Sequence, residues 1–166
     1  MAKIVTKIGD VFEVSLDDDN KKYFQYIAND MTQLNSSVIR AFKKIYTSKD
    51  IFNLPNIVKD EVDFYTHVVL RWGIEMNLWK KMGKIPEVGT MDIIFRGTSD
   101  YGKKIGEKRI DVSYNWYVWK INGERKNVGK LEGENRKAEI GIVMDGASIV
   151  HRMKTGEYDG FYPDFE

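Results

Sequence analysis

Cysteine is absent from this chain of 166 residues, which excludes disulfides, thiolate metal sites and thiol nucleophiles together. A chain without disulfides suits a reducing compartment, so we expect the protein to act in the cytoplasm. Histidine occurs only twice, at His67 and His151, too few for the histidine-rich metal centres of many hydrolases. The sequence therefore indicates neither a metal site nor a cofactor.

Long apolar runs and an excess of one charge are also missing. No segment approaches the roughly 18 apolar residues that cross a membrane, and Met1 to Asp10 lacks the apolar run of a secretion signal. The 26 basic and 25 acidic residues leave a net charge of +1. No overall field therefore favours a membrane or nucleic acid as a partner, and the sequence indicates no oligomeric state.

What is present is a globular composition, with 42% hydrophobic and 13% aromatic residues and only three prolines. A chain of this length can bury one sizeable core, so residues 1–166 are expected to form a single domain.

Apolar residues that alternate with polar ones predict a series of strands. Asp17 to Asn20 predicts a turn after the first strand, and the Asn122-Gly123 pair predicts a tight hairpin. The expected strands are Val11–Leu16, Tyr23–Ala28, Val38–Tyr46, Met91–Arg96, Asp111–Asn122, Asn127–Leu131 and Ala138–Met144. The apolar residues of Val38–Tyr46 fit a helix face nearly as well, but a strand is favoured there.

The segment from Val58 to Trp79 fits two descriptions. Its spacing suits a long amphipathic helix, but Gly73 and the β-branched and aromatic content of Val62–Trp72 favour a strand, followed by a helical turn over Ile74–Trp79. Near the end, Asp145 predicts the cap of a helix through about Lys154.

Together these elements predict a mostly β (α+β) fold. We expect a strongly bent antiparallel sheet, or a partial barrel, with one or two short helices.

Several segments resemble reactive sites. Gly97 to Lys104 matches the first seven positions of a phosphate-binding loop, but Lys104 replaces the hydroxyl that holds magnesium and no helix is predicted after it. An exposed loop is the better interpretation. The Asp17–Asp19 run lacks the spacing of a calcium loop and is interpreted as a solvated turn. Asp60, Glu61 and Asp63 give only a weak indication of acid–base chemistry.

The histidines are interpreted in the same way. His67 is expected on the polar face of a strand, as a solvated or hydrogen-bonded surface residue. His151 is expected on the late helix, away from its apolar face. Presence alone does not make either one a general base, because that role depends on geometry.

An aromatic run gives the strongest indication of function. Tyr114, Trp116, Tyr117 and Trp119 place aromatic rings on both faces of one predicted strand, and Lys and Arg residues follow. One face must belong to the core, and exposed members of the other are candidates for binding a partner.

The start of the chain resembles a known family. Lys7 to Asp18, which includes the Gly-Asp-Val-Phe element, followed by Lys22–Ile27, is similar to the opening of the immunity protein 26 family of bacterial polymorphic toxin systems. Weaker similarity lies at Trp79–Lys84 and Ile149–Gly156. The resemblance implies a mostly β cytoplasmic protein that neutralises a cognate toxin by binding it, without catalysis.

Two further hypotheses stay open. The aromatic strand and its lysines also suit a β-domain that binds single-stranded nucleic acid or carbohydrate. An enzyme that uses His67 or His151 would require a pocket in which these side chains converge.

Overall fold

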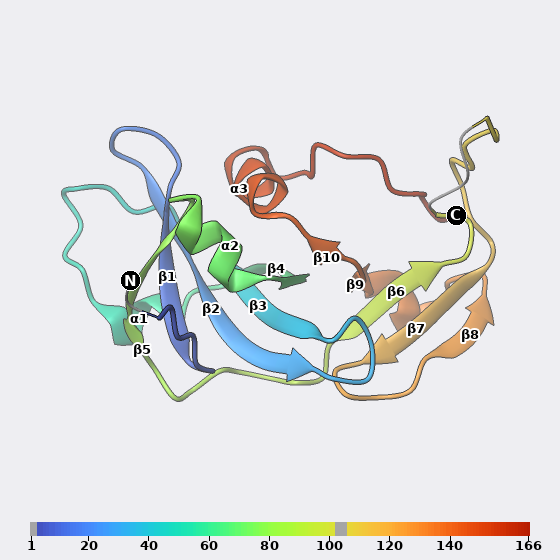
Figure 1. Ribbon diagram of the computed structural model, residues 1–166, viewed down its shortest axis with the longest axis horizontal. Coiled ribbons are helices and arrows are strands. Elements are labelled where there is room, and N and C mark those ends of the chain that lie inside the picture. The colour runs from blue at the N-terminus through green and yellow to red at the C-terminus, as the bar shows by residue number, and fades with distance from the viewer. Residues whose placement is uncertain (1–2, 102–105) are drawn as a thin grey trace.

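Two β-sheets lie side by side in the computed structural model, which describes residues 3–101 and 106–166 (Figure 1). The larger sheet has the strand order β10-β4-β3-β2-β1-β5, and the smaller one has the order β8-β7-β6-β9. The mostly β fold expected from the sequence is confirmed. The sheets are mixed rather than purely antiparallel, because β10 joins β4 and β9 joins β6 in parallel.

The strands of the larger sheet are β1 (Asp10–Ser15), β2 (Lys21–Asp30), β3 (Ser36–Phe42), β4 (Val62–Val68), β5 (Lys80–Lys84) and β10 (Val143–Met144). Those of the smaller sheet are β6 (Ile94–Thr98), β7 (Trp116–Lys120), β8 (Lys126–Gly129) and β9 (Glu139–Ile140). The helices of the described residues are α1 (Leu54–Ile57), α2 (Leu70–Glu75), α3 (Gly146–Thr155) and the short 3₁₀ helix η1 (Gly133–Lys137).

Both predicted turns are confirmed. The Asp17 carboxylate accepts hydrogen bonds from the backbone N–H groups of Asp19 and Asn20 at 3.0 and 2.8 Å, which closes the turn between β1 and β2. Asn122 has a φ of +61° and leads into Gly123 between β7 and β8. Left-handed backbone of this kind suits the right-handed twist of a hairpin, so the residue types account for the turn.

The segment from Val62 to Trp72 is not a continuous strand. β4 ends at Val68, and Trp72 lies in α2, which begins four residues before the predicted helical turn. Gly73 favoured a strand in the sequence, but its role is packing. A Cβ atom at Gly73 would lie 1.9 Å from the indole ring of Trp79, so only glycine lets that ring lie against the helix.

The predicted strand Ala138–Met144 is also divided. β9 belongs to the smaller sheet and β10 to the larger one, and Gly141 and Ile142 connect them. A Cβ atom at Gly141 would lie 2.1 Å from the ring of Trp119 and 2.7 Å from the carbonyl oxygen of Arg96. The chain therefore crosses between sheets at a point where only glycine fits.

The helix predicted after Asp145 is confirmed as α3. The Asp145 side chain accepts a 2.8 Å hydrogen bond from the backbone of Ser148, and Gly156 ends the helix with a φ of +91°. α2 and α3 cover one face of the larger sheet, and α1 covers part of the other face (Figure 1). No helix among the described residues is long and apolar enough to span a membrane.

Candidate functional site

The aromatic run divides between core and surface. Trp116 and Trp119 are 1% and 3% exposed, whereas Tyr114 is 50% exposed and Tyr117 is half-buried. The two tryptophans are therefore core residues rather than candidates for direct contact with a partner. The physical reason is that both faces of β7 are covered, one by the larger sheet and the other by the C-terminal residues.

Trp116 packs beneath the C-terminal residues. Its ring lies 6.3 Å from that of Phe165, centre to centre, and its Nε1–H donates a 2.8 Å hydrogen bond to the carbonyl of Ser113. The guanidinium carbon of Arg96 lies 5.5 Å from the Trp116 ring and 4.9 Å from that of Phe165. Burial lowers the pKa of Arg96, and these ring faces favour its charge in return. The C-terminal residues therefore cover this face of the smaller sheet.

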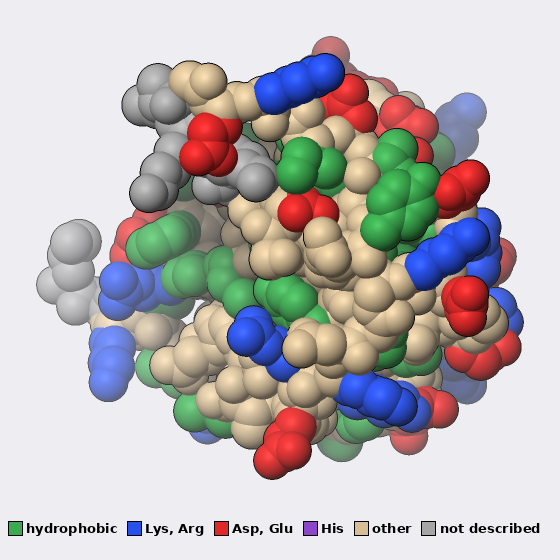
Figure 2. Space-filling view, turned by 90° about the vertical axis from the view of Figure 1, so that its right-hand side faces the viewer, with side chains coloured by type: hydrophobic (Ala, Val, Ile, Leu, Met, Phe, Trp, Pro, Cys, Tyr) green, Lys and Arg blue, Asp and Glu red, His purple; other side chains and the backbone are tan. Residues whose placement is uncertain are grey.

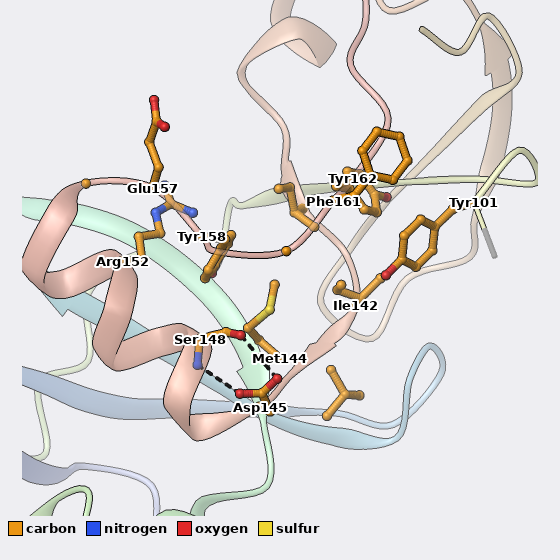
Figure 3. Close-up of a pocket in the computed structure, with 14 residues that line it drawn as sticks. Tyr101, Ile142, Met144, Asp145, Ser148, Arg152, Glu157, Tyr158, Phe161 and Tyr162 are labelled. Carbon is orange, nitrogen blue, oxygen red and sulfur yellow. Dashed lines mark hydrogen bonds between the residues drawn. The ribbon is translucent and has the colours of Figure 1, made fainter. Parts of the chain in front are cut away.

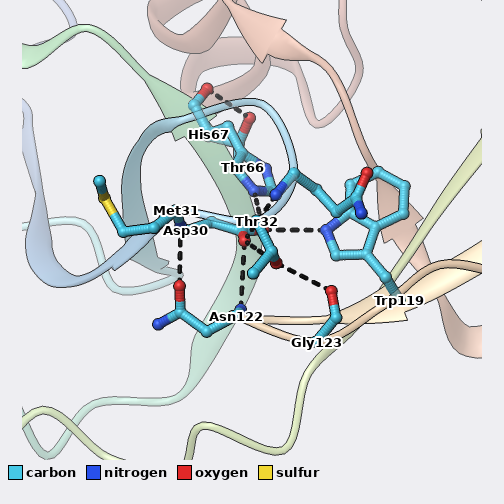
Figure 4. A network of polar contacts seen from close by, with 9 residues as sticks. Asp30, Met31, Thr32, Thr66, His67, Trp119, Asn122 and Gly123 are labelled. Carbon is cyan, nitrogen blue, oxygen red and sulfur yellow. Dashed lines mark hydrogen bonds and ion pairs between the residues drawn. The ribbon is translucent and has the colours of Figure 1, made fainter.

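Trp119 takes part in a buried polar network that joins the two sheets (Figure 4). Asp30, at the end of β2, accepts hydrogen bonds of 2.9 Å from Nε1 of Trp119 and from Nε2 of His67 on β4. Its other oxygen accepts a 3.1 Å bond from the backbone N–H of Asn122. The Asn122 side chain in turn accepts a 2.7 Å bond from the backbone N–H of Met31. The hairpin turn between β7 and β8 is therefore tied to the turn between β2 and β3.

His67 is 0% exposed, so the prediction of a surface histidine is wrong. The reason is that its polar partner, Asp30, is itself buried and lies far away in the sequence. Burial lowers the pKa of His67 against the opposing effect of Asp30, so the ring is neutral and its Nε2–H is the donor. Burial also acts to raise the pKa of Asp30, but the hydrogen bonds it accepts outweigh this and lower it.

The paired Asp30 and His67 have the residue types of an acid–base dyad without access to a substrate. Neither side chain has exposed surface, and Nδ1 of His67 has no hydrogen-bond partner. A general base must reach the proton that it removes. The hydrogen bonds of Asp30 instead hold the two sheets together. His151, by contrast, is half-buried on α3.

The segment that resembles a phosphate-binding loop begins inside the smaller sheet. Gly97 lies under the ring of Tyr117, where an added Cβ atom would come within 2.5 Å of it. The hydroxyl of Thr98 lies 2.6 Å from that of Ser113. Gly102, Lys103 and Lys104 lie outside the described residues. Residues 106–115 contain no helix, so the described part of this region lacks the helix N-terminus of a phosphate site.

The acidic residues singled out in the sequence have local roles. Asp17 closes its turn, Glu61 forms a 2.8 Å salt bridge with Lys43, and Asp60 accepts a hydrogen bond from the hydroxyl of Tyr46. Within residues 3–101 and 106–166, no group of three histidine or carboxylate side chains is placed to hold a metal ion.

A recess of about 500 Å³ opens beside Tyr117. The guanidinium carbon of Arg125 lies 4.6 Å from the centre of the Tyr117 ring. Asn115 and Asn127 also line the recess, and the amide nitrogen of Asn115 donates a 3.2 Å hydrogen bond to Asp100. Tyr117 faces Asn127 across the hairpin, so the register of β7 and β8 brings these groups together.

Arg125 is one of the basic residues that follow the aromatic run in the sequence, whereas Asn127 was not identified as a binding residue. The Asn122-Gly123 turn could have identified Asn127, because pairing the two strands on either side of this turn places Asn127 beside Tyr117. Figure 2 shows the end of the molecule on the right of Figure 1, where acidic, basic and apolar side chains are intermixed. This face therefore carries no field of a single sign.

Tyr114 does not line this recess, and its hydroxyl group is already hydrogen-bonded. Its hydroxyl donates a 2.6 Å hydrogen bond to the carboxylate of Glu166, and this bond raises the pKa of the phenol. Arg136 donates to the backbone carbonyl of Glu166 at 2.7 Å. Tyr114 thus helps to hold the last residues of the chain over the smaller sheet while its ring stays exposed.

No protein-family model, curated protein or solved structure matches the chain.

Proposed function

We propose that this protein is a non-catalytic, cytoplasmic immunity protein that binds and neutralises a cognate bacterial toxin. The observation that carries the proposal is the recess of about 500 Å³, which Tyr117 and Arg125 line together. Tyrosine and arginine are enriched among the residues that dominate binding energy at protein interfaces. A rigid sheet presents them here, so little side-chain entropy is lost when a partner binds.

The kind of partner comes from the sequence. Lys7–Asp18 and Lys22–Ile27 resemble the immunity protein 26 family, and this resemblance is the reason to propose a toxin as the partner. The chain has no cysteine, which agrees with action in a reducing cytoplasm. The intermixed charges of this end suit a partner of mixed charge rather than a strongly basic nuclease surface.

Co-expression with the toxin encoded by the neighbouring gene tests the proposal. We expect the protein to restore growth and to form a complex with the purified toxin. Tyr117→Ala and Arg125→Glu should each weaken that complex at least about tenfold, as loss of an interface anchor does. Lys49→Glu is the matched control for the charge reversal, because Lys49 is exposed on the distant loop after β3.

Three results would contradict the proposal. The first is failure to protect cells from any neighbouring toxin. The second is protection that Tyr117→Ala and Arg125→Glu leave unchanged. The third is an equal loss in the Lys49→Glu control, which would show that general charge rather than this surface matters.

The second candidate is a module that binds single-stranded nucleic acid or carbohydrate in the same recess. The combination of the Tyr117 ring, the Arg125 guanidinium and the amides of Asn115 and Asn127 favours it, since bases and sugars both stack on rings and bond to amides. Binding to an oligonucleotide that falls steeply with salt would support nucleic acid. Binding to neutral oligosaccharides that salt does not change would support carbohydrate.

A further inference from the structure

A second concavity lies where the two sheets meet, away from the recess beside Tyr117. It is a cleft of about 520 Å³ between the β9–β10 crossing, α3 and the residues that follow α3 (Figure 3). Its walls are mixed: the apolar residues Ile142, Met144 and Phe161 line it beside polar and charged residues. A volume of this size falls within the range of roughly 300–1,000 Å³ that holds small organic ligands.

Among the residues that the structure describes, Arg152 is the one cation that lines this cleft. Arg152 projects from the last turn of α3, and its guanidinium carbon lies 4.1 Å from the centre of the Phe64 ring and 4.7 Å from that of Tyr158. Two aromatic faces therefore hold the guanidinium in place and favour its charge. Within residues 3–101 and 106–166, no carboxylate lies within 4.0 Å of Arg152 to form a salt bridge.

The acidic groups near the cleft balance this charge only in part. The Asp145 carboxylate is occupied by the backbone and hydroxyl of Ser148, at 2.8 and 3.1 Å. Figure 3 shows the Glu157 carboxylate pointing away from the apolar walls. Glu139 interacts with Arg152 electrostatically, but burial raises the pKa of Glu139 to about 7, so it is only partly ionised at neutral pH. Arg152 is thus a preorganised cation in a cleft that also presents apolar residues.

From these observations, we propose that the cleft binds a small carboxylic acid with an apolar body, its carboxylate on Arg152 and its ring or alkyl chain against Ile142, Met144 and Phe161. A guanidinium fork matches the two oxygens of a carboxylate. The apolar residues of the lining favour the ring or alkyl chain of such a ligand. This site is separate from the proposed toxin-binding surface.

Titration calorimetry with 3-phenylpropionate, indole-3-acetate and octanoate tests this assignment. The uncharged amides of the same acids are the matched ligand controls. We expect at least one of the acids to bind and its amide to bind at least about tenfold more weakly, because the amide lacks the charge that Arg152 recognises. Binding should also weaken as salt is raised.

Three variants locate the site. Arg152→Gln should weaken binding of the acid at least about tenfold, whereas Lys154→Gln should leave it within about twofold. Lys154 is the matched control because it lies on the same helix, carries the same charge and is exposed outside the cleft. Val143→Trp should abolish binding by filling the cleft, and it leaves Arg152 in place. Val143 is 40% exposed, so this change is compatible with the fold.

The proposal is overturned if none of the three acids binds at about 1 mM, or if acid and amide bind equally well. It is also overturned if Arg152→Gln and Lys154→Gln lose the same amount, or if Val143→Trp binds as the parent does. A peptide with a free C-terminal phenylalanine that binds at least tenfold better than the free acids would assign the cleft to a protein chain instead. Thermal unfolding of each variant shows whether a loss of binding reflects a loss of the fold.

Discussion

The carboxylate of Asp30 accepts a 2.9 Å hydrogen bond from the indole of Trp119, a residue 89 positions further along the chain and in the other sheet. The same oxygen accepts a second bond from His67. With the backbone of Asn122 bound to the other oxygen, one fully buried carboxylate connects β2, β4 and the hairpin of the smaller sheet. Because the Asp30 carboxylate has this many hydrogen-bond partners, a small chemical change to it should lower the stability of the fold.

Asp30→Asn should lower the free energy of unfolding by about 3 kcal/mol, although the side chain keeps its shape. The new amide places an N–H donor against other donors, whichever way it is turned. Denaturant unfolding measures the change. Asp18→Asn is the control, because Asp18 is exposed in the turn after β1 and should change stability little.

The stability of the protein should fall as pH drops below about 6.5 through His67. Burial holds the folded pKa of His67 below its unfolded value, so in acid the unfolded chain binds a proton that the folded chain excludes. The loss levels off below the folded pKa. Unfolding curves of the parent and His67→Gln between pH 7.5 and 5 should show a stability difference that narrows in acid. A constant difference would contradict the neutral, buried histidine.

Glu139 should have the opposite dependence on pH. Its pKa rises from 4.5 in the unfolded chain to about 7 in the folded one, because burial disfavours the carboxylate. Stability from this group is complete below pH 4.5 and is lost as pH rises through 7. Glu139→Gln should therefore resemble the parent in acid and be up to about 3 kcal/mol more stable at pH 8. Glu134→Gln, at an exposed residue of η1, should show no such divergence.

Gly141→Ala should destabilise the fold by about 1–3 kcal/mol, because the added methyl group overlaps the Trp119 ring and cannot shift away from the Arg96 carbonyl. Gly160→Ala is the matched control, since a Cβ atom there meets nothing within 4 Å. Thermal unfolding of both variants tests the comparison. Equal melting temperatures for the two would show that the crossing between sheets has room to relax.

Local signals accounted for much of the fold. The turn at Asp17, the hairpin at Asn122-Gly123 and the cap of α3 at Asp145 were all predicted correctly. In each case the residue bonds to backbone within a few positions or adopts a positive φ. Such features depend on short stretches of chain, and the sequence displays them directly.

Long-range packing is what the sequence did not reveal. Glu13 lies on the polar side of an alternating strand, yet it is only 5% exposed because Tyr23 and Lys21 bond to it. Gly73 favours a strand in the sequence, but in the structure it lies in a helix, where the ring of Trp79 packs against it. These outcomes depend on neighbours that periodicity within one segment cannot identify.

The candidate sites were predicted only in part. The sequence placed Tyr114 and Tyr117 in a binding run, and both retain exposed surface. It also placed Trp116 and Trp119 there, because composition does not show that a second layer covers each face of β7. Arg152 was not identified at all, since its setting is created by residues of β4 and of the segment after α3.

The short connection between β9 and β10 limits how the two sheets can move. Only Gly141 and Ile142 separate a strand of one sheet from a strand of the other. This link of two residues restricts how far β9 and β10 can separate, and it thereby restricts relative movement of the two sheets. Since Ile142 also lines the cleft, a ligand bound there would contact this link.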